Sequence, residues 1–206
     1  DKHRVLGFEL RANSLWTQVF SNIVTELKLD EAPEDEIAAW QELLDEVRRA
    51  NNVPLGRTRP IPLDGDIGLE RNGFQLQGNN VAYTKPLMIL VDEFSASAAD
   101  AFPAIMQDNG RAIVAGHRTM GLGGSVIGWS LNGYCECDTS ITASLMVRKQ
   151  PVDTAGEFPT APYVENIGVR PDVPIEYMTA ENLASKGKPF VEAFTKAMLE
   201  HIAKNQ

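Results

Sequence analysis

Apolar residues recur at helical spacing in two segments near the start of the sequence. Residues 14–27 carry an apolar residue at every fourth position, which predicts a helix that Asn13 or Ser14 can cap. Its apolar face would consist of Leu15, Val19, Ile23 and Leu27. Residues 32–50 predict a second helix, because acids stand in its first turn and basic residues in its last. The apolar face of this helix would consist of Ile37, Trp40, Leu44 and Val47.

The pattern changes over residues 51–85, which are rich in Gly, Pro and Asn. We expect a long excursion with short strands there, which could form the rim of an active site or, more ordinarily, a surface loop. Residues 87–92 and 111–116 are apolar runs that predict buried strands of a mainly parallel sheet, the first covered on both faces. Residues 97–109 predict the helix between them, with Pro103 causing a kink or a late helix start.

The last third of the chain predicts a hairpin and a terminal helix. Residues 124–131 and 135–148 alternate apolar and polar positions, and Asn132-Gly133 suits the hairpin turn between them. Residues 188–205 predict an amphipathic helix. The alternation of strands and helices indicates an α/β domain.

Composition and charge narrow the function classes. The 206 residues, 43% hydrophobic and 23% charged, are typical of a soluble globular chain of one domain to one and a half. The net charge of −9 argues against binding of nucleic acid, which needs Lys and Arg to neutralise phosphates. We find no apolar run long enough for a transmembrane segment. The charged start without Met leads us to expect a fragment of a longer protein.

Two cysteines, Cys135 and Cys137, stand one residue apart and would face the same side of a strand. A metal site needs more ligands nearby than this pair offers, so no metal is expected. Two structural thiols are the simplest interpretation, and a strained disulfide bridge or a redox pair is the alternative.

The most informative stretch is "LVDEFSASAADAFPAIMQDNGR", residues 90–111, in which a strand leads through Ser95 and Ser97 into a helix. Free N–H groups and the helix dipole stabilise negative charge at such a helix start. A serine nucleophile would gain from that field, and small neighbours such as Ala98 would let a substrate carbonyl approach. Serine is also a common helix cap, so from these residues alone capping and catalysis both remain open.

Residues 90–126 resemble the core of the tail-specific, or C-terminal processing, serine proteases (peptidase family S41). In that family a strand leads into a Ser-Ala-Ser-Ala-type segment, a helix ending in Gln-Asp-Asn, a second strand and a Gly-rich turn. The stretch "YVENIGVRPDVPIE", residues 163–176, resembles a later motif of the same family. The resemblance covers roughly residues 86–178. In the first stretch it rests on Asp92, Ser95, Ala96, Ser97, Ala98, Gln107, Asp108, Asn109, Arg111, Gly116, Thr119 and Gly121.

This resemblance implies an α/β fold of the ClpP/crotonase type, built from stacked strand-strand-helix units. It also implies a serine endopeptidase in which Ser97 is the nucleophile, forms an acyl-enzyme and has Ser95 as a structural neighbour. The N–H group of Ala98 would be one oxyanion donor, and the family's other donor lies in a Gly-rich segment that we do not find in this chain. No metal or organic cofactor is implied.

One position departs from the best-known branch of the family, which pairs the serine with a lysine. Here Leu122 stands at that position, and a leucine cannot accept a proton, so a Ser-Lys mechanism is excluded at this site. The Gly-rich turn and the "ENIGVRPD" segment resemble instead the branch of the tricorn-protease core, which uses a histidine base and a supporting glutamate. The resemblance makes Glu165 the candidate for that supporting acid.

The base should then be a histidine, and the chain has His3, His117 and His201. His117 falls where the family usually has Glu, which suggests a structural role. His201 lies in the terminal helix and is expected to face solvent, while His3 stands at the very start. We therefore expect the base to lie upstream of residue 1.

The resemblance also sets the expected domains and partners. Residues 1–206 would form the C-terminal part of a protease catalytic domain, with a helical segment (1–50), a loop-rich excursion (51–85) and a catalytic core (86–206). Domains absent from this chain would lie upstream, a PDZ domain that binds the tail of a protein or peptide substrate among them. Bacterial members of the family are mostly exported, so an extracytoplasmic location, periplasmic or secreted, is expected. The alternative is a non-catalytic ligand- or peptide-binding module of the same fold.

Other residues near the motif have ordinary interpretations. Asp100 stands in the first helical turn, where an acid complements the helix dipole. Asp172 is expected to brace a turn. The paired acids Asp92 and Glu93 are expected to be solvated turn residues, and binding of a basic substrate side chain is the alternative. Phe94 and Met120 could line an apolar substrate pocket, and a place in the core is equally compatible.

Overall fold

The computed structural model describes residues 6–53, 56–62, 83–130, 133, 135–154, 156–157 and 159–205. The fold is mixed α/β, and the chain divides into two compact units. Unit 1 contains Asp1–Leu6, Asn72–Gly123 and Arg148–Gln206, and unit 2 contains Gly7–Arg71 and Gly124–Val147. No helix in the described ranges combines the length and the apolar character that crossing a membrane requires.

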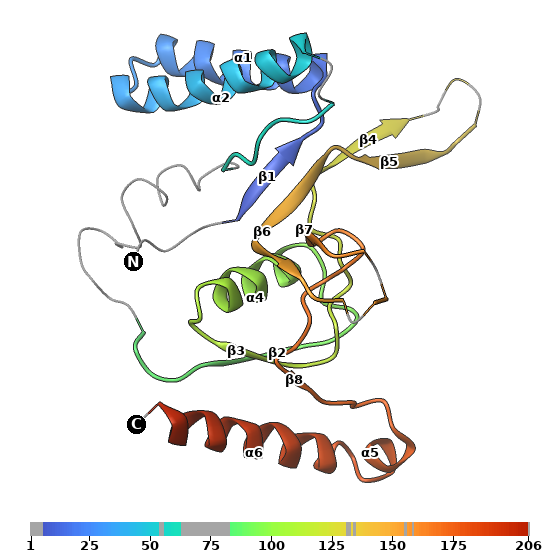
Figure 1. Ribbon diagram of the computed structural model, residues 1–206. Helices are drawn as coiled ribbons and strands as arrows, with labels where there is room; N and C mark the ends of the chain where they lie inside the picture. The colour runs from blue at the N-terminus through green and yellow to red at the C-terminus, as the bar shows by residue number, and fades with distance from the viewer. Residues whose placement is uncertain are drawn as a thin grey trace. The chain divides into compact units, whose positions relative to one another are not determined.

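In unit 2, helices α1 (Ser14–Leu29) and α2 (Glu34–Asn52) lie side by side (Figure 1). Both helices were predicted, and the Asn13 side chain caps α1 by accepting from the N–H of Trp16 at 3.1 Å. The predicted apolar face of α1 is right in part: Ile23 packs against the core, but the centre of the buried face lies one position further along the helix. Phe20 and Val24 are buried, whereas Leu15 is 42% exposed.

Aromatic packing accounts for this shift of the α1 face. The ring of Phe20 lies 6.0 Å from that of Trp16 and 5.8 Å from that of Trp40 on α2, measured between centroids. A shift of one residue turns a helix face by about 100°, and large aromatic rings bury more apolar area than Leu or Val. The core of unit 2 therefore gathers around Phe20. Its other buried members are Leu10, Val24, Leu43, Leu44, Val47 and Ile61.

The only charged residue buried in α2 is Glu46, whose side chain is held by two arginines. Its carboxylate accepts from the Arg49 guanidinium at 2.6 and 2.8 Å. It also accepts from the guanidinium of Arg59 at 2.9 Å and from the Arg59 main-chain N–H at 2.8 Å. The hydrogen bonds from Arg49 are the largest cause that lowers the pKa of Glu46 from 4.5 to about 2.

The predicted hairpin is present in unit 2. Strands β4 (Val126–Ser130) and β5 (Asp138–Thr142) pair antiparallel, while Asn132 of the predicted turn lies outside the described residues. The run 135–148 was expected as one strand, and that is wrong, because β6 (Ser144–Val152) is separate. Ala143 interrupts the run: its N–H donates to Ser125 O at 2.8 Å, and its carbonyl accepts from the N–H of Arg11 at 2.9 Å. Strand β1 (Gly7–Leu10) pairs antiparallel with the first part of β6.

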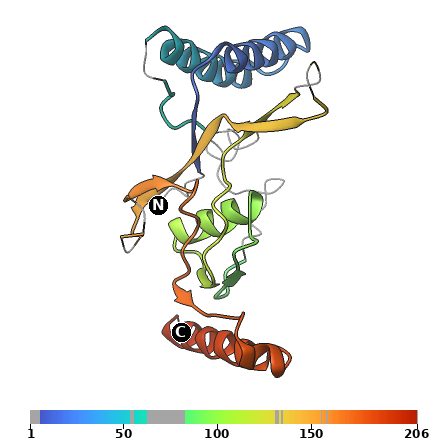
Figure 2. The ribbon, with the colours of Figure 1, turned by 90° about the vertical axis from the view of Figure 1, so that its right-hand side faces the viewer.

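In unit 1, a parallel sheet has the order β2 (Met88–Val91), β3 (Ile113–Gly116) and β8 (Val173–Pro174). Helix α4 (Ala98–Asp108) lies on one face of this sheet and α6 (Lys188–Lys204) on the other (Figures 1 and 2). Strand β7 (Ala161–Tyr163) and the short helix α5 (Ala180–Ala184) complete the unit.

The parallel sheet and its two helices confirm the predicted α/β pattern, with two corrections. Strand β2 is not buried on both faces, since Leu90 is 45% exposed. Helix α6, on the face of the sheet away from α4, has no buried residue and so covers that face only loosely. Helix α4 begins at Ala98 although Pro103 lies inside it, so the late helix start is wrong. The side chain of Pro103 is fully buried.

The Gln-Asp pair at the end of α4 braces unit 1. Arg148, only 6% exposed, donates to Asp108 at 2.6 Å and to Gln107 at 2.8 Å. The amide of Gln107 donates in turn to Asp172 at 2.9 Å, and Asp172 accepts from the N–H of Val114 on β3 at 2.8 Å. These contacts confirm the structural role expected for Asp172.

The depressed pKa of Glu46 predicts an acid-sensitive contribution to stability. Because the folded pKa lies below that of the unfolded chain, this stabilisation is complete above about pH 4.5 and disappears as the pH falls towards 2. Glu46→Gln should lower the free energy of unfolding at pH 7 by about 1–3 kcal/mol and remove this part of the pH dependence. Denaturant unfolding at pH 7, 4.5 and 3 measures both effects. Glu42→Gln, at an exposed position of the same helix, should unfold like the wild type throughout.

Candidate active site

Ser97 lies in an unusual backbone conformation at the turn from β2 to α4. Its φ of 57° and ψ of −115° place a residue with a side chain in a region that costs about 1–3 kcal/mol. The residue is exposed, and so are Ala98 and Ala99, which begin the helix. Such strain persists only where surrounding contacts enforce it, and it is concentrated at functional sites.

The capping interpretation of Ser97 can be tested directly on the helix start. Asp100 Oδ2 accepts from the Ser97 N–H at 3.0 Å and the Ser97 side chain faces the Asp100 N–H, so the two residues have the arrangement of a capping box. In the other direction, the N–H of Asp100 donates to the Ser97 carbonyl at 2.9 Å. The Ser97 hydroxyl lies near this N–H without a well-formed hydrogen bond to it. The N–H groups at the start of the helix are therefore bound mainly by the Ser97 carbonyl and the Asp100 carboxylate.

The hydroxyl of Ser95, by contrast, is committed to its own turn. It donates to Asp92 Oδ1 at 2.9 Å and accepts from the Asp92 N–H at 3.1 Å. The same Asp92 oxygen accepts from the N–H of Phe94 at 3.1 Å. The turn that precedes Ser97 is thus closed by side-chain contacts, which supports a structural role for Ser95.

Asp100 is completely buried and accepts four hydrogen bonds. Besides Ser97, its donors are the Thr119 hydroxyl and the N–H groups of Gly121 and Leu122, the last two at 3.0 Å. From the sequence it was expected only to complement the helix dipole. The Ser-x-x-Asp spacing of a capping box could have indicated the contact with Ser97. The contacts with residues 119–122 bridge some twenty positions, and no local pattern predicts them.

Residues 119–122 are fastened in turn to the segment that contains Glu165. The Thr119 hydroxyl accepts from the N–H of Val169 at 2.7 Å, and the Gly121 carbonyl accepts from the N–H of Asn166 at 2.9 Å. The backbones approach so closely that a Cβ on Gly168 would lie 2.4 Å from the Thr119 oxygen. Gly168 also has a φ of +69°, which favours glycine.

The structure therefore brings the turn of Glu165 to the loop that holds the start of α4. Glu165 is half-buried there, between the buried Val164 and the exposed Asn166. Ser97 and Ala98 are adjacent at the helix start, where the first N–H groups have no partner within the helix. The arrangement can place an exposed hydroxyl beside donors suited to an oxyanion.

Two of the three histidines that could act as a base, His117 and His201, lie within the described residues. The ring of His117 is about half exposed, and its Nδ1 lies 3.9 Å from Glu93 Oε2. His201 lies on α6 beside Asn205, whose amide donates to the His201 carbonyl at 2.7 Å. In the part of the chain that the structure describes, no hydrogen bond joins either histidine to Ser97. His3 lies outside the described residues.

Glu93 is more than a solvated turn residue. Burial and a hydrogen bond with Glu93 raise the pKa of Tyr177 to about 12. Since Glu93 also faces His117, it belongs to a polar cluster at the end of β2.

Three apolar side chains close to the serine turn in sequence or through main-chain hydrogen bonds are exposed. Phe94 is 70% exposed, Met120 39% and Leu122 56%. The alternative that Phe94 and Met120 belong to the core is therefore wrong. Leu122, the residue at which the sequence departs from the Ser-Lys branch, binds Asp100 through its N–H.

Metal ligands do not gather in the described part of the chain, where no three His, Cys, Asp or Glu side chains form a group that could hold a metal ion. Cys135 and Cys137 are both exposed and free, so the alternative of a disulfide bridge between them is wrong. A hydrogen bond with Cys135 raises the pKa of Cys137.

Comparison with known proteins shows the family to which the chain belongs. The profile of Peptidase family S41 matches residues 43–175, and the chain belongs to this family. An uncharacterized protein of Chlamydia muridarum is 39% identical over 139 residues, which are 66% of this chain and 20% of that protein. The carboxyl-terminal-processing peptidase 3 of Arabidopsis thaliana chloroplasts is 30% identical over 156 residues, 68% of this chain and 28% of that protein.

A solved structure shares the fold across nearly the whole chain. The crystal structure of mature CPAF matches with a TM-score of 0.69 and 23% identity, covering 98% of this chain and 40% of that one. The likeness shows a common mixed α/β fold. The chain spans only about a fifth of the length of the Chlamydia relatives it matches.

The close approach at Gly168 predicts a large cost for a single added methyl group. Gly168→Ala should lower the free energy of unfolding by roughly 3–5 kcal/mol, because left-handed strain and a clash with the Thr119 carbonyl add together. Gly110→Ala is the matched control: its φ of +60° is similar, but no atom lies within 4 Å of the added Cβ. It should cost about 1–2 kcal/mol. Equal losses in denaturant unfolding would contradict the close approach.

Proposed function

We propose that this chain carries the nucleophile of a serine endopeptidase that hydrolyses peptide bonds through an acyl-enzyme on Ser97. The observation that carries the proposal is the strained backbone of an exposed serine, φ 57° and ψ −115°, between a strand and a helix. A sharp strand-to-helix turn of this kind presents a serine hydroxyl to substrate in other serine hydrolases. Membership of a peptidase family supports the same chemistry.

The reaction divides into two balanced steps. The Ser97 oxygen attacks the substrate carbonyl and its proton passes to a base, while the Ala98 N–H helps to hold the oxyanion. The base then protonates the leaving amine, the C–N bond breaks and an ester on Ser97 remains. Water, deprotonated by the same base, attacks this ester, and the base then returns the proton to the Ser97 oxygen as the carboxylate product leaves.

We assign the base to a histidine upstream of residue 1, and the lack of a hydrogen bond from His117 or His201 to Ser97 within the described residues supports this. Glu165 supports that base, as the third member of a triad does. In this proposal residues 1–206 form the C-terminal part of a ClpP/crotonase-type catalytic domain with its core at residues 86–206, and upstream domains, a PDZ domain among them, deliver the substrate. An extracytoplasmic location is part of the same proposal and rests on the family alone.

The substrate is proposed to be a protein or peptide with an apolar side chain near the cleaved bond. The exposed side chains of Phe94, Met120 and Leu122 support this, because their main chains flank Ser97 and apolar surface there gains free energy when covered. Similarity to a carboxyl-terminal-processing peptidase supports cleavage near the carboxyl end of the substrate.

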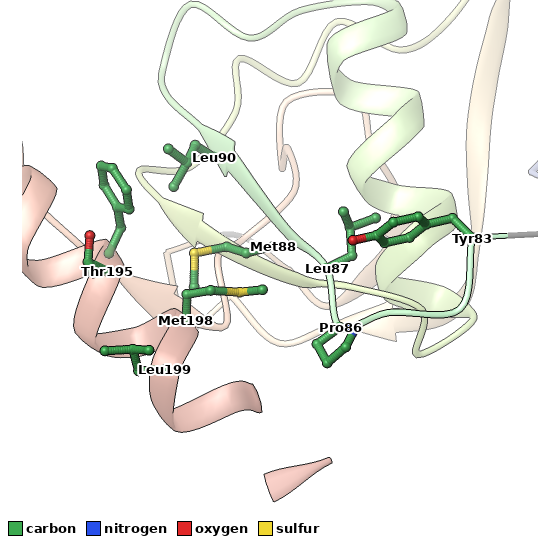
Figure 3. A pocket seen from close by; sticks show the side chains of 9 residues that line it. Tyr83, Pro86, Leu87, Met88, Leu90, Thr195, Met198 and Leu199 are labelled. Carbon is green, nitrogen blue, oxygen red and sulfur yellow. The ribbon is translucent and has the colours of Figure 1, made fainter. Parts of the chain in front are cut away.

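A non-catalytic binding module remains the second candidate, favoured by one pocket. Between β2 and α6 lies a cavity of about 370 Å³ into which Met88, Leu90, Met198 and Leu199 point (Figure 3). Its lining is mainly apolar, as in sites for small apolar ligands. Ser97 is not among the lining residues, so this pocket and the serine turn are separate features.

A fluorophosphonate separates the two candidates, because it modifies serines that are activated in place. The full natural chain should gain one adduct on Ser97, located by intact mass and peptide mapping, and Ser97→Ala should abolish it. Ser14 is an exposed serine at the start of α1 without a positive φ, and it should stay unmodified. A folded protein without an adduct, or an adduct that survives in the variant, would remove Ser97 as the nucleophile.

The role of Glu165 is tested by Glu165→Gln, which keeps the size of the side chain and removes its charge. If Glu165 supports the base, the rate of fluorophosphonate modification should fall on the order of 100-fold. Glu157→Gln is the control, since Glu157 is an exposed acid that forms an ion pair with Arg170. The hydrogen bond from Arg170 lowers the pKa of Glu157, so this variant also removes a charged carboxylate. Equal rates in both variants would leave Glu165 without a catalytic role.

A further inference from the structure

We propose that Asp100 is a positioning residue for the nucleophile: its carboxylate fixes the strained turn of Ser97 and fastens it to the loop 119–122. The inference rests on the proposed function of Ser97. It adds a residue that acts on the reaction through another, without touching the substrate.

The environment of Asp100 is unusual for a charge. The residue has 0% exposure, and no Lys or Arg forms an ion pair with it within the described residues. Neutral groups supply all four donors: Oδ2 accepts from Ser97 and Leu122, and Oδ1 accepts from Thr119 and Gly121. Burial of a carboxylate is costly unless such donors satisfy it. The position at the start of α4 adds the favourable helix dipole.

These bonds fix the backbone on both sides of the strained residue. The N–H of Ser97 donates to the Asp100 side chain, and its carbonyl accepts from the N–H groups of Asp100 and Ala101, both at 2.9 Å. These main-chain and carboxylate contacts bind both peptide groups and hold the φ of 57°. The hydroxyl stays available for chemistry.

The loop 119–122 closes the arrangement from the other side. Three consecutive N–H groups serve the turn: Met120 donates to the Ser95 carbonyl at 2.9 Å, and Gly121 and Leu122 donate to Asp100. The loop therefore holds the chain before and after Ser97. Loss of the carboxylate would free two of these contacts at once.

An amide cannot replace the carboxylate here. Asn has one acceptor oxygen, and its NH₂ group would face two N–H or O–H donors. Asp100→Asn should therefore leave the turn of Ser97 free to relax. A displacement of about 1 Å in a catalytic group can slow a reaction about 100-fold while substrate binding is little changed.

The experiment measures fluorophosphonate inactivation of the full natural chain as two quantities, the maximal rate and the half-saturating concentration, together with the unfolding midpoint. In Asp100→Asn we expect the maximal rate to fall roughly 10- to 100-fold, with the half-saturating concentration within about twofold. Glu46→Gln is the control, because it also removes a buried carboxylate but lies in unit 2. It should lower the midpoint and leave the maximal rate unchanged.

Thr119 provides a second test should Asp100→Asn fail to fold. Thr119→Val removes one donor to Asp100, and Thr119→Ser keeps it. We expect the valine variant to react several-fold more slowly and the serine variant to restore the wild-type rate.

The outcomes distinguish this inference from the proposed function. If the wild type reacts at Ser97 and the folded Asp100 and Thr119→Val variants react equally fast, Asp100 is only a stabilising residue and the inference is wrong. If the folded wild type does not react at all, the proposed function fails and the inference fails with it. A selective loss of the maximal rate would support both.

Discussion

Thr119 joins the three segments on which the geometry of unit 1 depends. Its hydroxyl donates to Asp100 at the start of α4 and accepts from the N–H of Val169, while its own N–H donates to the Val169 carbonyl at 3.2 Å. The side chain is fully buried, so water cannot replace these bonds. Gly168 permits the approach, because any side chain there would collide with the Thr119 carbonyl. The conformation of the serine turn thus depends on contacts between residues that are distant in sequence.

Two buried carboxylates show different ways of holding a charge. Glu46 is paired with two arginines whose heads reach solvent, so its contribution depends on a charge that acid removes. Asp100 is bound by neutral donors of fixed geometry, three of them on the main chain. Glu46 binds one main-chain N–H, that of Arg59, whereas Asp100 binds three and therefore constrains the course of the backbone more strongly. The second arrangement is suited to a turn that must stay strained.

Local patterns were enough to predict most elements, because periodicity, dipole-complementing charges and turn residues act within a few positions. They predicted α1, α2, α4, α6 and the parallel strands β2 and β3. They failed where distant parts of the chain decide. Phe20, and not Val19, is buried because the ring of Trp40 lies on the neighbouring helix. Ala143 divides a strand because two other segments bind its main chain.

The candidate site was predictable in part for the same reason. The strand, the two serines and the helix lie within one short stretch, so Ser97 could be singled out from sequence and resemblance. Its positive φ and the four donors to Asp100 could not, since they arise when residues 119–122 fold back on the helix start. The exposure of Phe94 was equally hidden, because an aromatic residue near a motif suits a core as well as a surface.

Leu122 shows how the main chain and the side chain of one position can have separate roles. Its N–H binds Asp100, so the loop needs the backbone of residue 122 whatever side chain it carries. The side chain points outward and is 56% exposed, so it can change without disturbing those bonds. A leucine at this position is therefore compatible with an intact serine turn. Since the turn is held by main-chain N–H groups, its geometry does not depend on which side chain stands at position 122.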